Sequence, residues 1–284
     1  MKICWFDEGR LGLVEDDRVY DVSEALQELP APRYPAAPGD LLVSQLGRIR
    51  PTLEKLAPRA RSRHVDEVRF ASPVAQPGKI IGVPVNYAKH VDEAAAQVAD
   101  FGTRYSGGIR EQGFFLKAPS SLVGPSAGVR IAFSDRRNDH ELELAVVIGR
   151  EARHVEVSDA MSFVAGYAIG LDMVVRGPED RSMRKSCDTY SVLGPWMVTA
   201  DELSDPAALD FRLTIGSEVR QESNTKFMLM KIAEQIAFAS AFYTLHPGDV
   251  IMSGTCEGVG PVRPGDVMIC EFEGIGAMRV PVHG

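Results

Sequence analysis

Short runs of apolar, β-branched and aromatic residues recur through most of this 284-residue sequence, and Gly, Pro, Asn or Asp separates them. Such runs are typical of β-strands joined by turns. They lie at 79–85, 114–124, 141–150, 163–175, 194–203, 211–219, 249–255, 266–276 and 278–282. Two helices are expected, one at 87–99 with Asn86 as its N-cap and one at 228–243. The sequence therefore predicts an α+β protein that is mostly β.

The first 72 residues differ from the rest in pattern. Residues 1–25 alternate polar and apolar side chains around turns at 7–9 and 15–17, which predicts a small β-meander. An amphipathic segment at 41–56 follows a proline-rich stretch, and a link containing Pro, Gly and Ser begins at 71. These features predict a small N-terminal accessory domain at 1–72 and a main domain at 73–284.

Charge and cysteine usage restrict the class of partner. The net charge is −8 and no block of Lys and Arg occurs, which argues against binding to nucleic acid. The four cysteines lack CxxC spacing, as expected for free thiols in a reducing compartment. No apolar stretch approaches the ~20 residues of a membrane span. We therefore expect a cytoplasmic protein that binds neither nucleic acid nor membrane, although a local cationic pocket can still bind a small anion.

Glu141 and Glu143 form the sharpest local signal. Residues two apart in a strand project from the same face, so these carboxylates point together. The alternate positions, which are all apolar, must be buried: Leu142, Leu144, Val146 and Ile148. Two carboxylates ~6–7 Å apart on a partly buried face repel each other and have raised pKa values unless a cation neutralises them. Neutralising Glu141 in the metal-free protein is accordingly expected to leave stability unchanged or to increase it.

Asp172 is the expected third ligand. In the strand at 163–175 it shares a face with Gly166, Ala168 and Gly170, which leaves space for a metal and a substrate. Three carboxylates without a thiolate favour Mg²⁺ or Mn²⁺ over zinc. Spacing alone leaves open the alternative that these acids lie on a solvated strand face.

Taken in order, the motifs of residues 79–282 resemble those of the fumarylacetoacetate hydrolase family. They read IIGVPVNYAKHVDEA, FFLKAPSSLVGP, DHELELAVVIGR, VAGYAIGLDMVVR, KSCDTYSVLGPW, LHPGDVIMSGTCEGVGPVRPGD and EFEGIGAMR. The resemblance implies a mixed β-sandwich roll, usually a homodimer, with one Mg²⁺ or Mn²⁺ per subunit. By motif position, it places the metal on Glu141, Glu143 and Asp172.

The resemblance also assigns roles to four other positions. Lys185 would be the catalytic lysine, because an ammonium near the metal can bind the substrate carboxylate or stabilise an enolate. Lys117, Arg176 and Thr255 would bind substrate, with Thr255 using its hydroxyl and nearby backbone N–H groups for a carboxylate. Without the motifs, Lys117 and Lys185 would be interpreted as surface charges, and the Gly-rich segment around Thr255 would be interpreted as an ordinary turn.

His90 and Glu93 lie three residues apart on the expected helix, so their side chains can meet. A carboxylate that orients a histidine makes a general base able to activate water near neutral pH. An exposed ion pair is the alternative interpretation. Family members that hydrolyse C–C bonds carry such a pair on a helix over the site, and this favours the catalytic interpretation.

The expected reaction is metal-dependent hydrolysis of a C–C bond in an acylpyruvate-like 1,3-diketo acid of the fumarylacetoacetate or fumarylpyruvate type. A decarboxylase or tautomerase of the same fold is the first alternative, acting on oxaloacetate or 2-hydroxyhepta-2,4-diene-1,7-dioate. A non-catalytic protein that binds small molecules is the second. Two departures from the family pattern, Gly177-Pro178-Glu179 and Cys256-Glu257, leave the substrate open.

Overall fold

The computed structural model describes residues 1–31, 34–96, 108–203 and 205–284, which form a central sheet, a second sheet and a three-stranded ribbon. The central sheet has 11 strands in the order β4-β3-β2-β1-β13-β11-β10-β16-β5-β6, with β7 beside β13. The second sheet has the order β15-β14-β18-β19-β8, and the ribbon has the order β12-β9-β17. Most pairs are antiparallel, whereas β16–β5, β13–β7 and β19–β8 are parallel. The expected mixed β-sandwich is confirmed.

The central strands are β1 (Lys2–Phe6), β2 (Arg10–Glu15), β3 (Arg18–Asp21), β4 (Ser62–His64), β5 (Ile80–Gly82), β6 (Phe115–Lys117), β7 (Leu122–Val123), β10 (Leu142–Ile148), β11 (Val164–Asp172), β13 (Ser191–Thr199) and β16 (Val250–Thr255). The second sheet comprises β8 (Val129–Arg130), β14 (Asp210–Ile215), β15 (Glu218–Asn224), β18 (Val267–Phe272) and β19 (Gly276–His283). The ribbon comprises β9 (Asn138–His140), β12 (Val174–Val175) and β17 (Gly260–Pro261). The α-helices within the described ranges are α1 (Leu41–Ser44), α2 (Leu46–Leu56), α3 (Ala88–Ala96), α5 (Ile109–Gln112), α6 (Arg181–Arg184) and α7 (Ile232–Phe242).

Strand β10 is buried along its whole length because both faces of the central sheet are covered. Its Leu142 face belongs to the core that also contains Leu213 and Met268 of the second sheet. Its other face, with Ala145, belongs to a separate core that includes Ile49 of α2. The alternation predicted for this strand is therefore confirmed, and the polar residues at its start are held in the interior.

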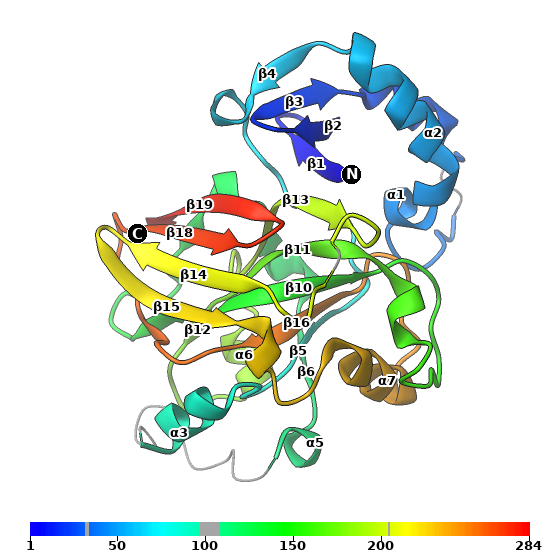
Figure 1. The fold of residues 1–284 in the computed structure, drawn as a ribbon. Coiled ribbons are helices and arrows are strands. Elements are labelled where there is room, and N and C mark those ends of the chain that lie inside the picture. Colours follow the sequence, from blue (N-terminus) through cyan, green and yellow to red (C-terminus); the bar gives the residue numbers. More distant parts are fainter. Residues whose placement is uncertain (32–33, 97–107, 204) are drawn as a thin grey trace.

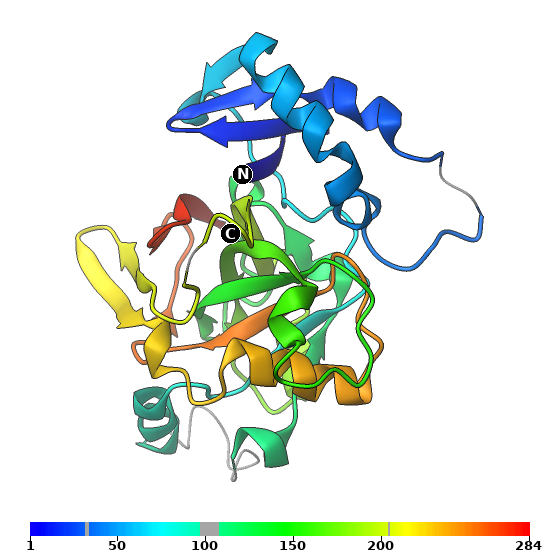
Figure 2. The same ribbon diagram turned by 45° about the vertical axis from the view of Figure 1, so that its right-hand side comes forward.

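The N-terminal segment continues the central sheet. The predicted meander is present as β1 to β3, and β1 pairs with β13, where Lys2 lies opposite Val198. Asp40 joins this segment to the link, because its carboxylate caps α1 at Val43 N and also accepts from the amides of Ala75 and Gln76. Figures 1 and 2 show the N-terminal strands and α2 at one end of the molecule, with α3, α5 and α7 at the other. The division into 1–72 and 73–284 stays a prediction.

Both expected helices are present with shifted ends. The second begins at Ile232, and the first begins at Ala88, with residues 97–99 lying outside the described part of the chain. The prediction that Asn86 caps the first helix is wrong. The fully buried Asn86 amide instead donates to the carbonyls of Met230 and Ser253 and accepts from Met230 N, so it joins three segments. Within the described ranges, none of the helices has the length and apolarity needed to cross a bilayer.

Candidate metal and active site

The carboxylates of Glu141, Glu143 and Asp172 converge at one end of β10 and β11. The Asp172 amide donates to the Glu141 carbonyl at 2.8 Å, which sets the two residues opposite each other. Glu143 pairs with Gly170 on one side and Thr255 on the other. One oxygen from each carboxylate lies within 4.8 Å of the others, and all three side chains are buried. The solvated strand face is thereby excluded, and the donor set fits a hard divalent cation.

The small residues beside Asp172 do not leave space for a metal and a substrate, so that expectation is wrong. A Cβ atom on Gly170 would lie 2.5 Å from Met252 Sδ, and one on Gly166 would lie 2.3 Å from the Val198 carbonyl oxygen. Close packing by neighbouring strands explains why these positions are glycine. Period-two spacing identified the shared face correctly, but it could not show what covers that face.

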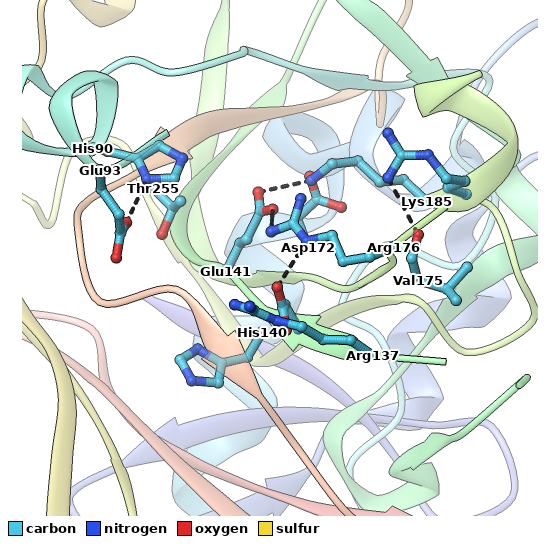
Figure 3. A network of polar contacts seen from close by, with 12 residues as sticks. His90, Glu93, Arg137, His140, Glu141, Asp172, Val175, Arg176, Lys185 and Thr255 are labelled. Atoms are coloured by element: carbon cyan, nitrogen blue, oxygen red, sulfur yellow. Dashed lines mark hydrogen bonds and ion pairs between the residues drawn. The ribbon is translucent and has the colours of Figure 1, made fainter. Parts of the chain in front are cut away.

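Two lysines neutralise the carboxylates. Lys185, directly after α6, places Nζ 2.7 Å from both Glu141 Oε2 and Asp172 Oδ2 (Figure 3). Lys117 donates to Asp172 Oδ1 and, at 2.7 Å, to the Tyr190 carbonyl. Burial lowers the pKa of Lys117. Burial also opposes the charge on Lys185, but attraction to Asp172 and Glu141 outweighs it and raises the Lys185 pKa. Neither lysine is a surface charge.

The surroundings shift the pKa values of the two glutamates in opposite directions. Burial raises the pKa of Glu141, but Lys185 and Arg176 outweigh burial and lower that pKa to about 2. Burial and the negative charge of Asp172 raise the pKa of Glu143 well above its ordinary value, although Gly254 N donates to Glu143 Oε2 at 2.7 Å. The expected raised pKa is therefore correct for Glu143 and wrong for Glu141, because Lys185 lies beside Glu141.

The His90–Glu93 pair is formed and is anchored to the Gly-rich turn. Nδ1 of His90 lies 3.0 Å from Glu93 Oε2, while Glu93 Oε1 accepts from Gly258 N at 3.1 Å. His90 is only 5% exposed, so the pair is not an exposed ion pair. Figure 3 draws the His90–Glu93 pair in one view with Thr255 and Glu141, and His90 is among the groups that lower the pKa of Glu141. Glu257, one of the unexpected residues, pairs with Lys89 at 3.3 Å.

Arg176 lies at the edge of the triad. Its Nε donates to Asp139 Oδ2 at 2.7 Å, and its Nη2 lies 3.7 Å from Glu141 Oε1. The unexpected Glu179 forms a two-point pair with Arg136, with N–O distances of 3.1 and 2.7 Å. Both departures from the family pattern thus form ion pairs around the site.

The Thr255 hydroxyl is part of a buried network that the sequence analysis missed. Its Oγ1 donates to the Leu142 carbonyl at 2.8 Å and accepts from Gln221 Nε2 at 2.7 Å. Gln221 Oε1 accepts from Leu142 N and faces His140 Nδ1. Gln221 belongs to β15 of the second sheet, and no spacing within that strand marks it as part of a site.

Comparisons with known proteins agree on a family. Residues 79–283 match the family model described as "Fumarylacetoacetate (FAA) hydrolase C-terminal". A maleylpyruvate hydrolase from Aquipseudomonas alcaligenes is 50% identical over 285 residues, covering 100% of this chain and 99% of that protein. A mitochondrial oxaloacetate tautomerase from Homo sapiens is 36% identical, covering 75% of this chain and 68% of that protein.

A solved structure matches the whole chain. The crystal structure of maleylpyruvate hydrolase from Sphingobium sp. SYK-6, in complex with manganese(II) and pyruvate, is 39% identical with a TM-score of 0.84. The match covers 100% of this chain and 99% of that one.

Proposed function

Because the chain belongs to the fumarylacetoacetate hydrolase family, we propose that it is a metal-dependent hydrolase that cleaves a C–C bond of an acylpyruvate. The observation that carries the proposal is the buried triad of Glu141, Glu143 and Asp172 beside an anchored His90–Glu93 pair. The similarity to maleylpyruvate hydrolases over the full length supports maleylpyruvate or a close relative as the proposed substrate.

The triad would hold one Mn²⁺ or Mg²⁺ ion. Three carboxylate oxygens within 4.8 Å of one another suit a small cation with oxygen preference, and the chain supplies no thiolate among them. When bound, the ion supplies Lewis acidity toward the oxygens of a 2-oxo acid.

The side chains around the triad divide the remaining work. His90, oriented by Glu93, removes a proton from the water that attacks the distal carbonyl of the acylpyruvate. The C–C bond next to that carbonyl then breaks, releasing a carboxylic acid and the enolate of pyruvate. Lys185 stabilises the enolate charge, because its ammonium is already held among the carboxylates at 2.7 Å. Protonation of the enolate carbon yields pyruvate.

Lys117, Arg176 and Thr255 are the proposed substrate-binding residues. Lys117 is fully buried and pairs with Asp172, so it would act on the substrate through charge and not as a rim group. Arg176, held on Asp139, carries a second positive charge at the edge of the triad. We place the carboxylate of the 2-oxo acid near Thr255, beside the triad.

Incubation of the purified protein with maleylpyruvate and with oxaloacetate, with and without Mn²⁺, tests the proposal. We expect Mn²⁺-dependent formation of pyruvate and maleate from maleylpyruvate. Tautomerisation of oxaloacetate without acylpyruvate cleavage would instead support the rival function, which the tautomerase relatives represent. Turnover that survives exhaustive chelation would contradict both.

We further propose that the enzyme works in the cytoplasm as a homodimer. The four cysteines are free in the described structure, which suits a reducing compartment. Sedimentation of the purified chain at micromolar concentration tests the dimer.

A further inference from the structure

Gln221 reaches from the second sheet into the active site. Its side chain is 1% exposed, and its Oε1 accepts from the backbone amide of Leu142, the residue between the proposed metal ligands Glu141 and Glu143. The Gln221 amide accepts from Leu142 N and donates to the Thr255 hydroxyl. The Thr255 hydroxyl in turn donates to the Leu142 carbonyl, so the three residues form a closed ring of hydrogen bonds.

Backbone partners fix the orientation of this amide. Oε1 faces Leu142 N at 2.9 Å, and an N–H group can only donate. Nε2 faces the Cys256 carbonyl at 3.1 Å, and a carbonyl can only accept. A flipped amide would place its NH2 group against Leu142 N and its oxygen against the Cys256 carbonyl, so donor would face donor and acceptor would face acceptor. It follows that His140 Nδ1, 3.1 Å from Oε1, carries a proton and donates it.

The same assignment of donors and acceptors fixes the direction of the Thr255 hydroxyl proton. Because Gln221 Nε2 donates to Oγ1 at 2.7 Å, the hydroxyl proton must point elsewhere, and it points to the Leu142 carbonyl at 2.8 Å. A substrate carboxylate can receive this hydrogen bond only if the proton turns away from Leu142. The hydrogen bond from Gln221 Nε2 to Thr255 Oγ1 is kept while the proton rotates. Because Oγ1 accepts this bond, the hydroxyl becomes a stronger donor.

We propose that Gln221 is a positioning residue that acts through Thr255: it holds the hydroxyl oxygen in place while the hydroxyl proton turns from the Leu142 carbonyl to the substrate carboxylate. This inference rests on the proposed function, because it takes the carboxylate of a 2-oxo acid as the ligand of Thr255. It adds a residue of the second sheet to a site built on the central sheet.

A double-mutant cycle tests the proposal. In Gln221→Met, which keeps the length of the side chain, we expect KM for maleylpyruvate and the inhibition constant of pyruvate to rise about tenfold, the usual effect of losing one well-placed hydrogen bond. The kcat value and the Mn²⁺ dissociation constant should change less than threefold. In a Thr255→Val background, Gln221→Met should raise KM and the pyruvate inhibition constant by less than twofold more, because the hydroxyl through which Gln221 acts is already absent.

Gln235→Met is the matched control. Gln235 is also fully buried, its Nε2 donates to the carbonyls of Met230 and Ser253, and none of the hydrogen bonds described for it involves Thr255. We expect it to lower thermal stability while KM and pyruvate inhibition stay within twofold of wild type.

The outcomes separate the two claims. Additive losses in the cycle, or a loss of Mn²⁺ affinity in place of pyruvate affinity, would overturn the role of Gln221 while maleylpyruvate cleavage by the wild type upholds the function. A wild type that does not cleave maleylpyruvate contradicts the function itself. If Gln221→Met does not fold, Gln221→Glu decides: its second oxygen captures the Thr255 proton, so pyruvate inhibition must weaken at least tenfold, and an unchanged inhibition constant would refute the proposal.

Discussion

Glu141 and Asp172 share one ammonium: Lys185 Nζ lies 2.7 Å from an oxygen of each carboxylate. The cross-strand bond from Asp172 N to the Glu141 carbonyl holds the two residues opposite each other, so the shared cation follows from the register of β10 and β11. A divalent cation that binds the same carboxylates must compete with Lys185 or shift it.

Lys185→Met therefore has opposite effects on metal binding and on catalysis. Removing the competing charge should tighten Mn²⁺ binding roughly tenfold, equivalent to about 1.4 kcal/mol. Loss of enolate stabilisation should lower kcat by roughly 10²–10³. Calorimetric titration with Mn²⁺ and steady-state kinetics measure the two effects. Weaker Mn²⁺ binding would show that Lys185 supports the metal site and does not compete with the ion.

The two glutamates should respond differently to neutralisation in the presence of chelator. Glu141→Gln removes a buried carboxylate whose pKa Lys185 and Arg176 lower to about 2, so we now expect a loss of about 3 kcal/mol in the free energy of unfolding in place of the neutral or stabilising effect expected from the sequence. Glu143→Gln mimics the protonated form that a raised pKa favours, so its cost should stay within about 0.5 kcal/mol. Denaturant unfolding of both variants in EDTA measures the difference. Equal losses would contradict the assignment of charge within the triad.

Thiol reactivity reports whether the Thr255 turn opens. Cys4, Cys256 and Cys270 are buried, and burial raises their pKa values, to about 12 for Cys256, so little nucleophilic thiolate forms at pH 8. Cys187 is half-buried. We expect the native protein to react slowly with a disulfide reagent at Cys187, and at the other thiols only after denaturation. Rapid labelling of Cys256, located by mass spectrometry, would mean that the turn opens in solution.

Local spacing predicted the parts of the site that lie on one element. Glu141, directly before β10, and Glu143 within it bring their carboxylates together, and His90 and Glu93 share a helix face, so period two and period 3.6 were sufficient. The family resemblance added the distant Lys185. Local spacing could not predict contacts between elements. The pKa of Glu141 depends on Lys185, 44 residues away, and the orientation of the Thr255 hydroxyl depends on Gln221, 34 residues away. Asn86 was misassigned for the same reason, because its partners, such as Met230, come from later in the chain.

Replacement of His90 separates hydrolysis from the rival reactions. If His90 activates water, His90→Ala should lower kcat for maleylpyruvate by roughly 10²–10⁴ while KM and Mn²⁺ affinity stay largely unchanged. Glu93→Gln should lose less, because the one oxygen of a Gln can still accept from His90 Nδ1 and orient the ring, although it no longer stabilises the imidazolium and its NH2 group cannot accept from Gly258 N.

Lys89→Gln is the control on the same helix, since the Lys89 side chain is 80% exposed and pairs only with Glu257 among the contacts described for it. It should leave kcat near the wild-type value. Oxaloacetate tautomerisation requires no attacking water, so a His90→Ala enzyme that keeps this reaction and loses maleylpyruvate cleavage would assign the pair to hydrolysis. Cleavage at the wild-type rate by His90→Ala, measured in single-turnover experiments where product release does not limit the rate, would rule out His90 as the base.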